Sequence, residues 1–114
     1  MKTKTPLKIV NLRKILKLHA LWLAFDPSGK KADLSYANLE GVDLMYANLS
    51  HANLSHANLS EANLSHANLS HANLWRVDLS EAVLFHVNLE YANLRDANFR
   101  DANFSFADPK GDQP

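Results

Sequence analysis

A five-residue period runs unbroken through the centre of the chain. From Ala32 to Phe106 the sequence divides into fifteen units of five residues, and the third place of every unit is Leu or Phe. The first place is always Ala or Val, and the second is Asn or Asp in every unit except the one that contains Val83. Any fold proposed for this chain has to explain that period.

A period of five fits neither an α-helix nor a flat strand. Successive third-place residues would be rotated by about 140° around a helix, and they would alternate between the two faces of a strand. They can all point inward only if the chain turns by a fixed angle in every unit and closes into coils. Stacked coils would then pair like parallel strands, about 4.8 Å apart.

The period therefore predicts an all-β solenoid with the third-place residues as its core. These residues are Leu34, Leu39, Leu44, Leu49, Leu54, Leu59, Leu64, Leu69, Leu74, Leu79, Leu84, Leu89, Leu94, Phe99 and Phe104. A small first-place residue leaves room for the large third one, so that neighbouring layers interdigitate. Asn or Asp in the second place can accept hydrogen bonds from a turning backbone. A disordered polar segment would lack such strictly spaced leucines.

The tandem motif A-(N/D)-L-x-x resembles the pentapeptide-repeat family. The resemblance covers residues 32–106, and it implies a right-handed quadrilateral β-helix with four units per coil and about four coils in all. The segment before the repeats strengthens it. His19-x-x-Trp22-Leu23, followed by Gly29-Lys30-Lys31 directly before the first unit, is similar to the leader of many cyanobacterial members. A cyanobacterial source is therefore expected.

Three segments follow from this division of the chain. Residues 1–31 form a basic N-terminal cap with an α-helix at about 12–25, which Asn11 can N-cap. Residues 32–106 form the solenoid, and residues 107–114 form a C-terminal tail in which Pro109 stands where Leu belongs. Because a solenoid exposes an apolar layer at each end, the helix is expected to cover the first coil.

Charge is distributed unevenly along the chain, although its formal sum is zero. Residues 1–31 carry a net charge of +7, residues 32–106 carry −6 and residues 107–114 carry −1. The basic helix could alternatively lie on an acidic membrane surface. No stretch reaches the roughly 18–20 apolar residues of a membrane span. A cytoplasmic location is expected, and a secreted or lumenal one stays open.

The residue types indicate a protein that is not an enzyme. The chain has no cysteine and only three glycines, so it contains neither a thiolate site nor a Gly-rich phosphate loop. Its serines occupy repeat positions, and no Ser, His and Asp order stands apart from the repeat. Six histidines raise the question of metal. An outward ladder offers two ligands where about four are wanted, so no metal and no cofactor are expected.

With four units per coil, residues twenty positions apart stack in columns on four sides. The leading hypothesis is a scaffold whose third side binds an unidentified protein, because aromatic residues are enriched at interfaces. The predicted contact residues are Tyr46, His66, Phe85, His86 and Phe106. The alternative is mimicry of DNA, since some family members protect DNA gyrase. The acidic column of Glu61, Glu81 and Asp101 would serve it. No direct binding of nucleic acid is expected.

The two ends of the solenoid differ. A helix can cover the first coil, but Pro109 and a polar tail leave the last coil, with Phe99 and Phe104, bare. We therefore expect that a homodimer can form through the C-terminal coil.

Overall fold

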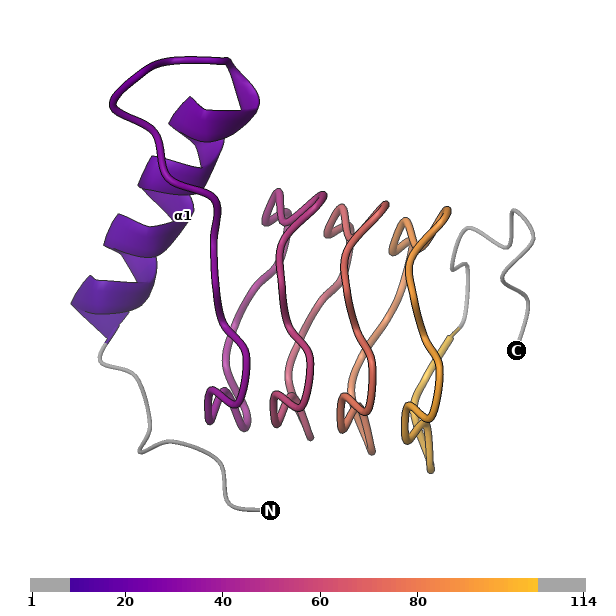
Figure 1. Ribbon diagram of the computed structural model, residues 1–114. Helices are drawn as coiled ribbons and strands as arrows, with labels where there is room; N and C mark the ends of the chain where they lie inside the picture. Colours follow the sequence, from indigo (N-terminus) through magenta and orange to yellow (C-terminus); the bar gives the residue numbers. More distant parts are fainter. Residues whose placement is uncertain (1–8, 105–114) are drawn as a thin grey trace.

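The structure, a computed structural model, describes residues 9–104. One α-helix, α1 (Ile9–Leu23), packs across the end of a stack of coils that runs from Ala32 to Phe104 (Figure 1). Parallel bridges join second-place residues twenty positions apart, from Asp33 and Asn53 to Val83 and Asn103. Twenty residues are four units of five, so each coil contains four units and has four corners. Phe106 and the tail 107–114 lie outside the described residues.

From Ala52 to Glu81 every backbone N–H has a regular acceptor. The first-place N–H donates to the third-place carbonyl of the preceding unit. The second-place N–H donates to a first-place carbonyl of the preceding coil. The third-place N–H donates to a second-place carbonyl of the following coil, and the fifth-place N–H donates to a fourth-place carbonyl of that coil. The fourth-place N–H donates to the Asx side chain of its own unit. In unit 52–56 these five distances are 3.0, 3.1, 2.8, 3.1 and 2.8 Å. The Asx is therefore needed because the fourth N–H has no backbone partner.

The inside of the stack is filled by the first-place and third-place residues. The third-place leucines from Leu34 to Leu89 are at most 3% exposed. In the last described coil, Leu94, Phe99 and Phe104 are only partly buried. The Leu and Ala side chains of successive layers pack closely in this interior.

The helix differs from the sequence expectation at both ends. It spans Ile9–Leu23 rather than 12–25, and Asn11 lies inside it and is exposed, so Asn11 is not the N-cap. At the other end the N–H of Phe25 donates to the carbonyl of Trp22 (3.0 Å), and that of Asp26 donates to Leu21 (3.0 Å). These two bonds form a Schellman motif, which ends the helix two residues earlier than expected.

The apolar side of α1 faces the first coil. Leu12 belongs to the buried core, Ile15 and Leu16 pack against it, and Arg13, Lys14 and Lys17 are exposed. The helix thus covers the open apolar layer that a solenoid presents at its end. Its apolar side is already occupied by protein, so a membrane contact of this helix would have to use other groups. No helix among residues 9–104 is long and apolar enough to cross a membrane.

Candidate functional site

The fifth-place side chains project from the corners of the coil and not from its flat sides. Each described fifth-place residue has a positive φ, for example 62° at Tyr46, 61° at His66 and 56° at His86. Together with the hydrogen bond from the next first-place N–H, this φ matches a type II turn. A non-glycine residue in this conformation costs roughly 1–2 kcal/mol. The side proposed from the sequence as a binding face is therefore a corner.

Aromatic rings stack along the third corner. The ring of Tyr46 lies 4.7 Å from that of His66 with an interplanar angle of 8°, and His66 lies 4.6 Å from His86 at 15°. Imidazole lone pairs lie in the ring plane, so those of two parallel rings cannot converge on one ion. Residues 11–104 also bring no three His, Asp or Glu side chains together as a metal site. The stack is an aromatic surface and not a chelating pair.

Apolar side chains widen this corner near the cap. Met45 is 43% exposed and Tyr46 is 69% exposed, while Val42 and Ala47 of the same coil are only partly buried. Phe85 is partly exposed two coils further on. We call this surface the third-corner strip. It consists of Val42, Met45, Tyr46, Ala47, His66, Phe85 and His86. Val42 and Ala47 were not predicted as site residues, because their exposure depends on where α1 lies.

A second aromatic group occupies the first corner and was missed by the sequence analysis. Tyr36 and His56 stack 4.5 Å apart, and the ring of Trp75 meets His56 edge-on at 4.8 Å. The guanidinium of Arg76 lies 5.4 Å from the Trp75 ring centroid. Trp75 is 36% exposed. Its position in the fourth place, where most units have Ser, was the signal that could have identified it.

His19 links helix α1 to the first coil through two hydrogen bonds of its imidazole ring. Its Nδ1 accepts the N–H of Ala32 (2.9 Å), so Nε2 must carry the proton, and Nε2 donates to the carbonyl of Ser50 (2.7 Å). The side chain is fully buried. Burial lowers the pKa of His19, and the nearby His51 and Lys31 lower it further, against the opposing effect of the bond to Ser50. Both bonds need the neutral imidazole.

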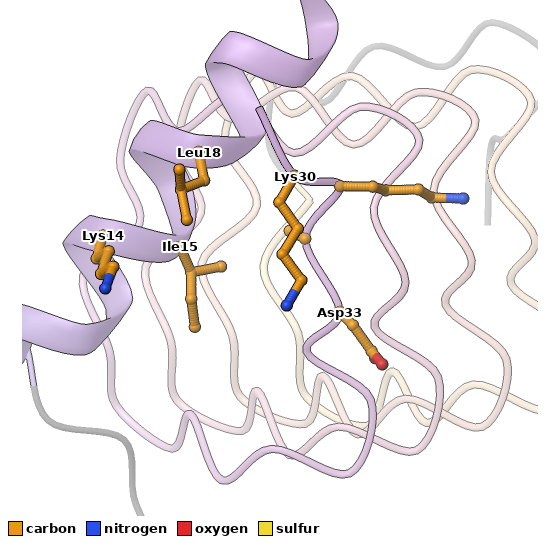
Figure 2. A pocket seen from close by; sticks show the side chains of 7 residues that line it. Lys14, Ile15, Leu18, Lys30 and Asp33 are labelled. Carbon is orange, nitrogen blue, oxygen red and sulfur yellow. The ribbon is translucent and has the colours of Figure 1, made fainter. Parts of the chain in front are cut away.

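Two hollows flank the helix. The first has a volume of about 280 Å³, and Figure 2 shows Lys14 and Lys30 on either side of Ile15, with Asp33 at the edge. The second, of about 350 Å³, is lined by Trp22, Leu23, Phe25 and His51. Lys31 connects them, since it lines the first, and its Nζ lies 5.7 Å from the Trp22 ring centroid. Both hollows are open apolar surfaces beside cations, without a catalytic arrangement.

Comparison with known proteins decides the family. The family model described as pentapeptide repeats matches residues 30–60, 47–84 and 78–108, which together cover more than half of the chain. The chain is a pentapeptide-repeat protein. No curated protein matches it.

Solved relatives of this pentapeptide-repeat protein come from a plant and from cyanobacteria. A pentapeptide-repeat protein of the Arabidopsis thaliana thylakoid lumen is 32% identical, with a TM-score of 0.66 over 68% of this chain and 54% of that one. This chain therefore spans about half the length of the Arabidopsis protein. A Nostoc pentapeptide-repeat protein is 33% identical over 78% of this chain and 83% of its own, with a TM-score of 0.43.

HetL of Nostoc, a pentapeptide-repeat protein involved in regulating heterocyst differentiation, is 40% identical. The match covers 69% of this chain and 39% of HetL, with a TM-score of 0.40. Of these three structures, the Arabidopsis one, with a TM-score of 0.66, supports the repeat fold of this chain.

The last described coil of the pentapeptide-repeat protein is less covered than the middle ones. Ala92, Ala97 and Ala102 are partly exposed, whereas first-place residues of the two middle coils are buried. The rings of Phe99 and Phe104 lie 5.2 Å apart within this layer. The two residues expected to mediate self-association are thus neighbours on a partly exposed apolar layer.

Proposed function

We propose that this pentapeptide-repeat protein is a non-enzymatic scaffold that binds a protein partner along the third-corner strip. The observation that carries the proposal is the exposure of Met45 and Tyr46 beside the incompletely covered Val42 and Ala47. Exposed apolar and aromatic side chains favour a protein interface.

The stacked rings add rigidity to this surface. Tyr46, His66 and His86 hold each other at 4.6 to 4.7 Å, on turns fixed by interlayer hydrogen bonds. Aromatic side chains that are already ordered lose little conformational entropy when a partner binds. The right-handed winding of the coil and a cyanobacterial source are part of the same proposal and rest on the family resemblance.

The experiment compares paired variants as bait in extracts of the source cell. Replacing Tyr46 and Phe85 by Ser should abolish capture of a discrete partner, with a melting curve close to that of the parent. Replacing Glu61 and Glu81 by Ser, which removes two exposed side chains from the second corner, is the matched control and should leave capture intact. Loss of the partner from the acidic variant alone would refute the third-corner assignment.

DNA mimicry is the weaker alternative. The second corner does carry Glu61, Glu81 and Asp101 as exposed residues. However, Asp101 is paired with Arg100 at 3.7 Å. One carboxylate per layer, about 4.8 Å apart, is also sparse beside one charge per ~1.7 Å in duplex DNA. Inhibition of gyrase supercoiling by the parent but not by the acidic variant would favour this alternative.

We also propose that the last coil pairs with a second copy of the chain. Its partly exposed layer contains Phe99 and Phe104, and a two-fold contact would let the same surface cover itself. Sedimentation velocity of the parent should show a dimer that the Phe104→Lys variant loses. If the parent sediments as a monomer at high concentration, the pairing does not occur.

A further inference from the structure

Phe25 occupies a position where its side chain has no role in the fold. It is the C′ residue of the Schellman motif, with φ at 62°, a place that glycine fills without steric cost. Its side chain is 95% exposed. The chain thus holds a large aromatic group in water in an unfavourable backbone conformation, although glycine would satisfy the same hydrogen bonds. Tyr91 has the same φ, but its ring stacks on His71 at 5.0 Å, whereas Phe25 is almost fully exposed, and this difference favours a contact of Phe25 outside the chain.

The surroundings of Phe25 are aromatic and cationic. Trp22, 36% exposed, lines the same hollow, and its ring is held by stacking on His19 at 5.6 Å and by Lys31. Lys30 and Lys31 follow on the connecting segment. Arg13, Lys14 and Lys17 are exposed on α1. Helix α1 and the segment that connects it to the first coil lie together at one end of the stack, the cap end (Figure 1).

Two acidic groups lie near these cations, Asp33 at the edge of the first hollow and Asp26 in the loop after α1. The Asp26 carboxylate accepts hydrogen bonds from the backbone N–H and the hydroxyl of Ser28, at 2.8 and 2.7 Å, and these bonds lower its pKa. The hydrogen bonds stabilise the ionised form, so Asp26 keeps its negative charge near neutral pH. Residues 9–33 carry five cationic side chains against these two carboxylates, so this end has a net positive charge.

We propose that the cap end docks on an anionic phospholipid surface, with Phe25 as its inserted anchor and the lysines as its electrostatic contacts. Phe and Trp side chains enter the headgroup boundary, and basic residues close to an anionic leaflet add attraction. The apolar groups around Phe25 are the Trp22 ring and the partly buried Leu23, which line the second hollow with it. That area is small for the centre of a stable protein interface, whereas interfacial anchoring needs only a few side chains with surrounding cations.

The test is co-sedimentation of the full chain with vesicles of phosphatidylglycerol mixed equally with phosphatidylcholine, and with vesicles of phosphatidylcholine alone. The parent should bind the anionic vesicles, lose binding as salt is added, and ignore the neutral ones. Phe25→Gly should weaken binding at least about tenfold. It should also melt no lower than the parent, because glycine relieves the left-handed conformation.

Matched variants separate this role from general effects. Tyr91, which is exposed with a φ of 62°, gives the control Tyr91→Gly, and it should bind vesicles like the parent. Replacing Lys30 and Lys31 by Gln should weaken binding by about thirtyfold. Replacing Arg95 and Arg100 by Gln removes the same charge at the far end and should change binding little. The proposal fails if the parent does not bind anionic vesicles, or if Phe25→Gly binds them as well as the parent does.

Discussion

Replacing His19 by Leu tests how the helix is attached to the solenoid. The change removes an acceptor for the N–H of Ala32 and a donor for the carbonyl of Ser50, and both groups lie beside a fully buried side chain. Each buried polar group left without a partner costs about 1–3 kcal/mol, so the variant should lose roughly 2–6 kcal/mol of stability. Leu has nearly the volume of His, so little of the loss should come from packing.

The assay is urea denaturation followed by circular dichroism. His71→Ala is the control, because His71 is exposed and its ring stacks on those of His51 and Tyr91 at its corner. The control should cost less than about 1 kcal/mol. If His19→Leu unfolds at the same urea concentration as the control, the two hydrogen bonds do not hold the cap and the reasoning is wrong.

The same residue predicts a pH dependence. The pKa of His19 in the folded protein is below its ordinary value of 6.5, with burial as the main cause. Above pH 6.5 the imidazole is neutral in both states, so stability is unaffected. As the pH falls below 6.5, the unfolded chain binds a proton that the folded protein resists. This site then lowers stability by up to about 1.4 kcal/mol per pH unit, until the folded pKa is reached. The parent should therefore lose more stability between pH 7 and pH 5 than His19→Leu loses.

Further substitutions test the connecting segment and the repeat. A Cβ on Gly29 would overlap the backbone of Trp22, so Gly29→Ala should cost about 1–3 kcal/mol, and an unchanged melting temperature would contradict that close approach. Val83→Asn supplies the missing acceptor for a fourth-place N–H and should add about 0.5–1.5 kcal/mol, whereas no gain would mean that water already satisfies that group. Leu64→Ala should cost about 2–5 kcal/mol by opening a cavity, and Ala57→Leu should cost about 1–3 kcal/mol by overpacking. If both melt with the parent, these residues do not point inward.

The repeat was predictable because its physical causes are local. Each Leu, small residue and Asx has the same neighbours in every unit, so fifteen copies of one pattern identify one environment. Twenty-residue stacking followed from the family resemblance. In the structure the rings of Tyr46 and His66, twenty positions apart, are stacked as expected. The left-handed backbone of the fifth place was not predictable, because Tyr, His and Glu do not favour it. Because this conformation belongs to the turns between the sides of the coil, the residues predicted to form a flat binding face lie at a corner.

The cap was predictable only in outline. Asn11 looked like an N-cap because it precedes an apolar run, but this local preference is weak when Ile9 and Val10 already belong to the helix. The role of His19 depends on Ala32, 13 residues away, and on Ser50, 31 residues away. No local pattern encodes contacts of that separation. Val42 was missed for the same reason, since its exposure depends on its neighbours in α1, whereas Trp75 could have been identified from its fourth place, where most units have Ser.

The most direct test of the proposed function is site-specific photo-cross-linking in the source cell. A benzoyl-phenylalanine residue placed at Tyr46 or Phe85 keeps an aromatic side chain on the third-corner strip, and the same group at Glu61 or Glu81 reports on the second corner. We predict that both third-corner positions cross-link to the same protein and that both second-corner positions do not. Cross-linking of a partner from the second corner alone, or from none of the four positions, would contradict the account.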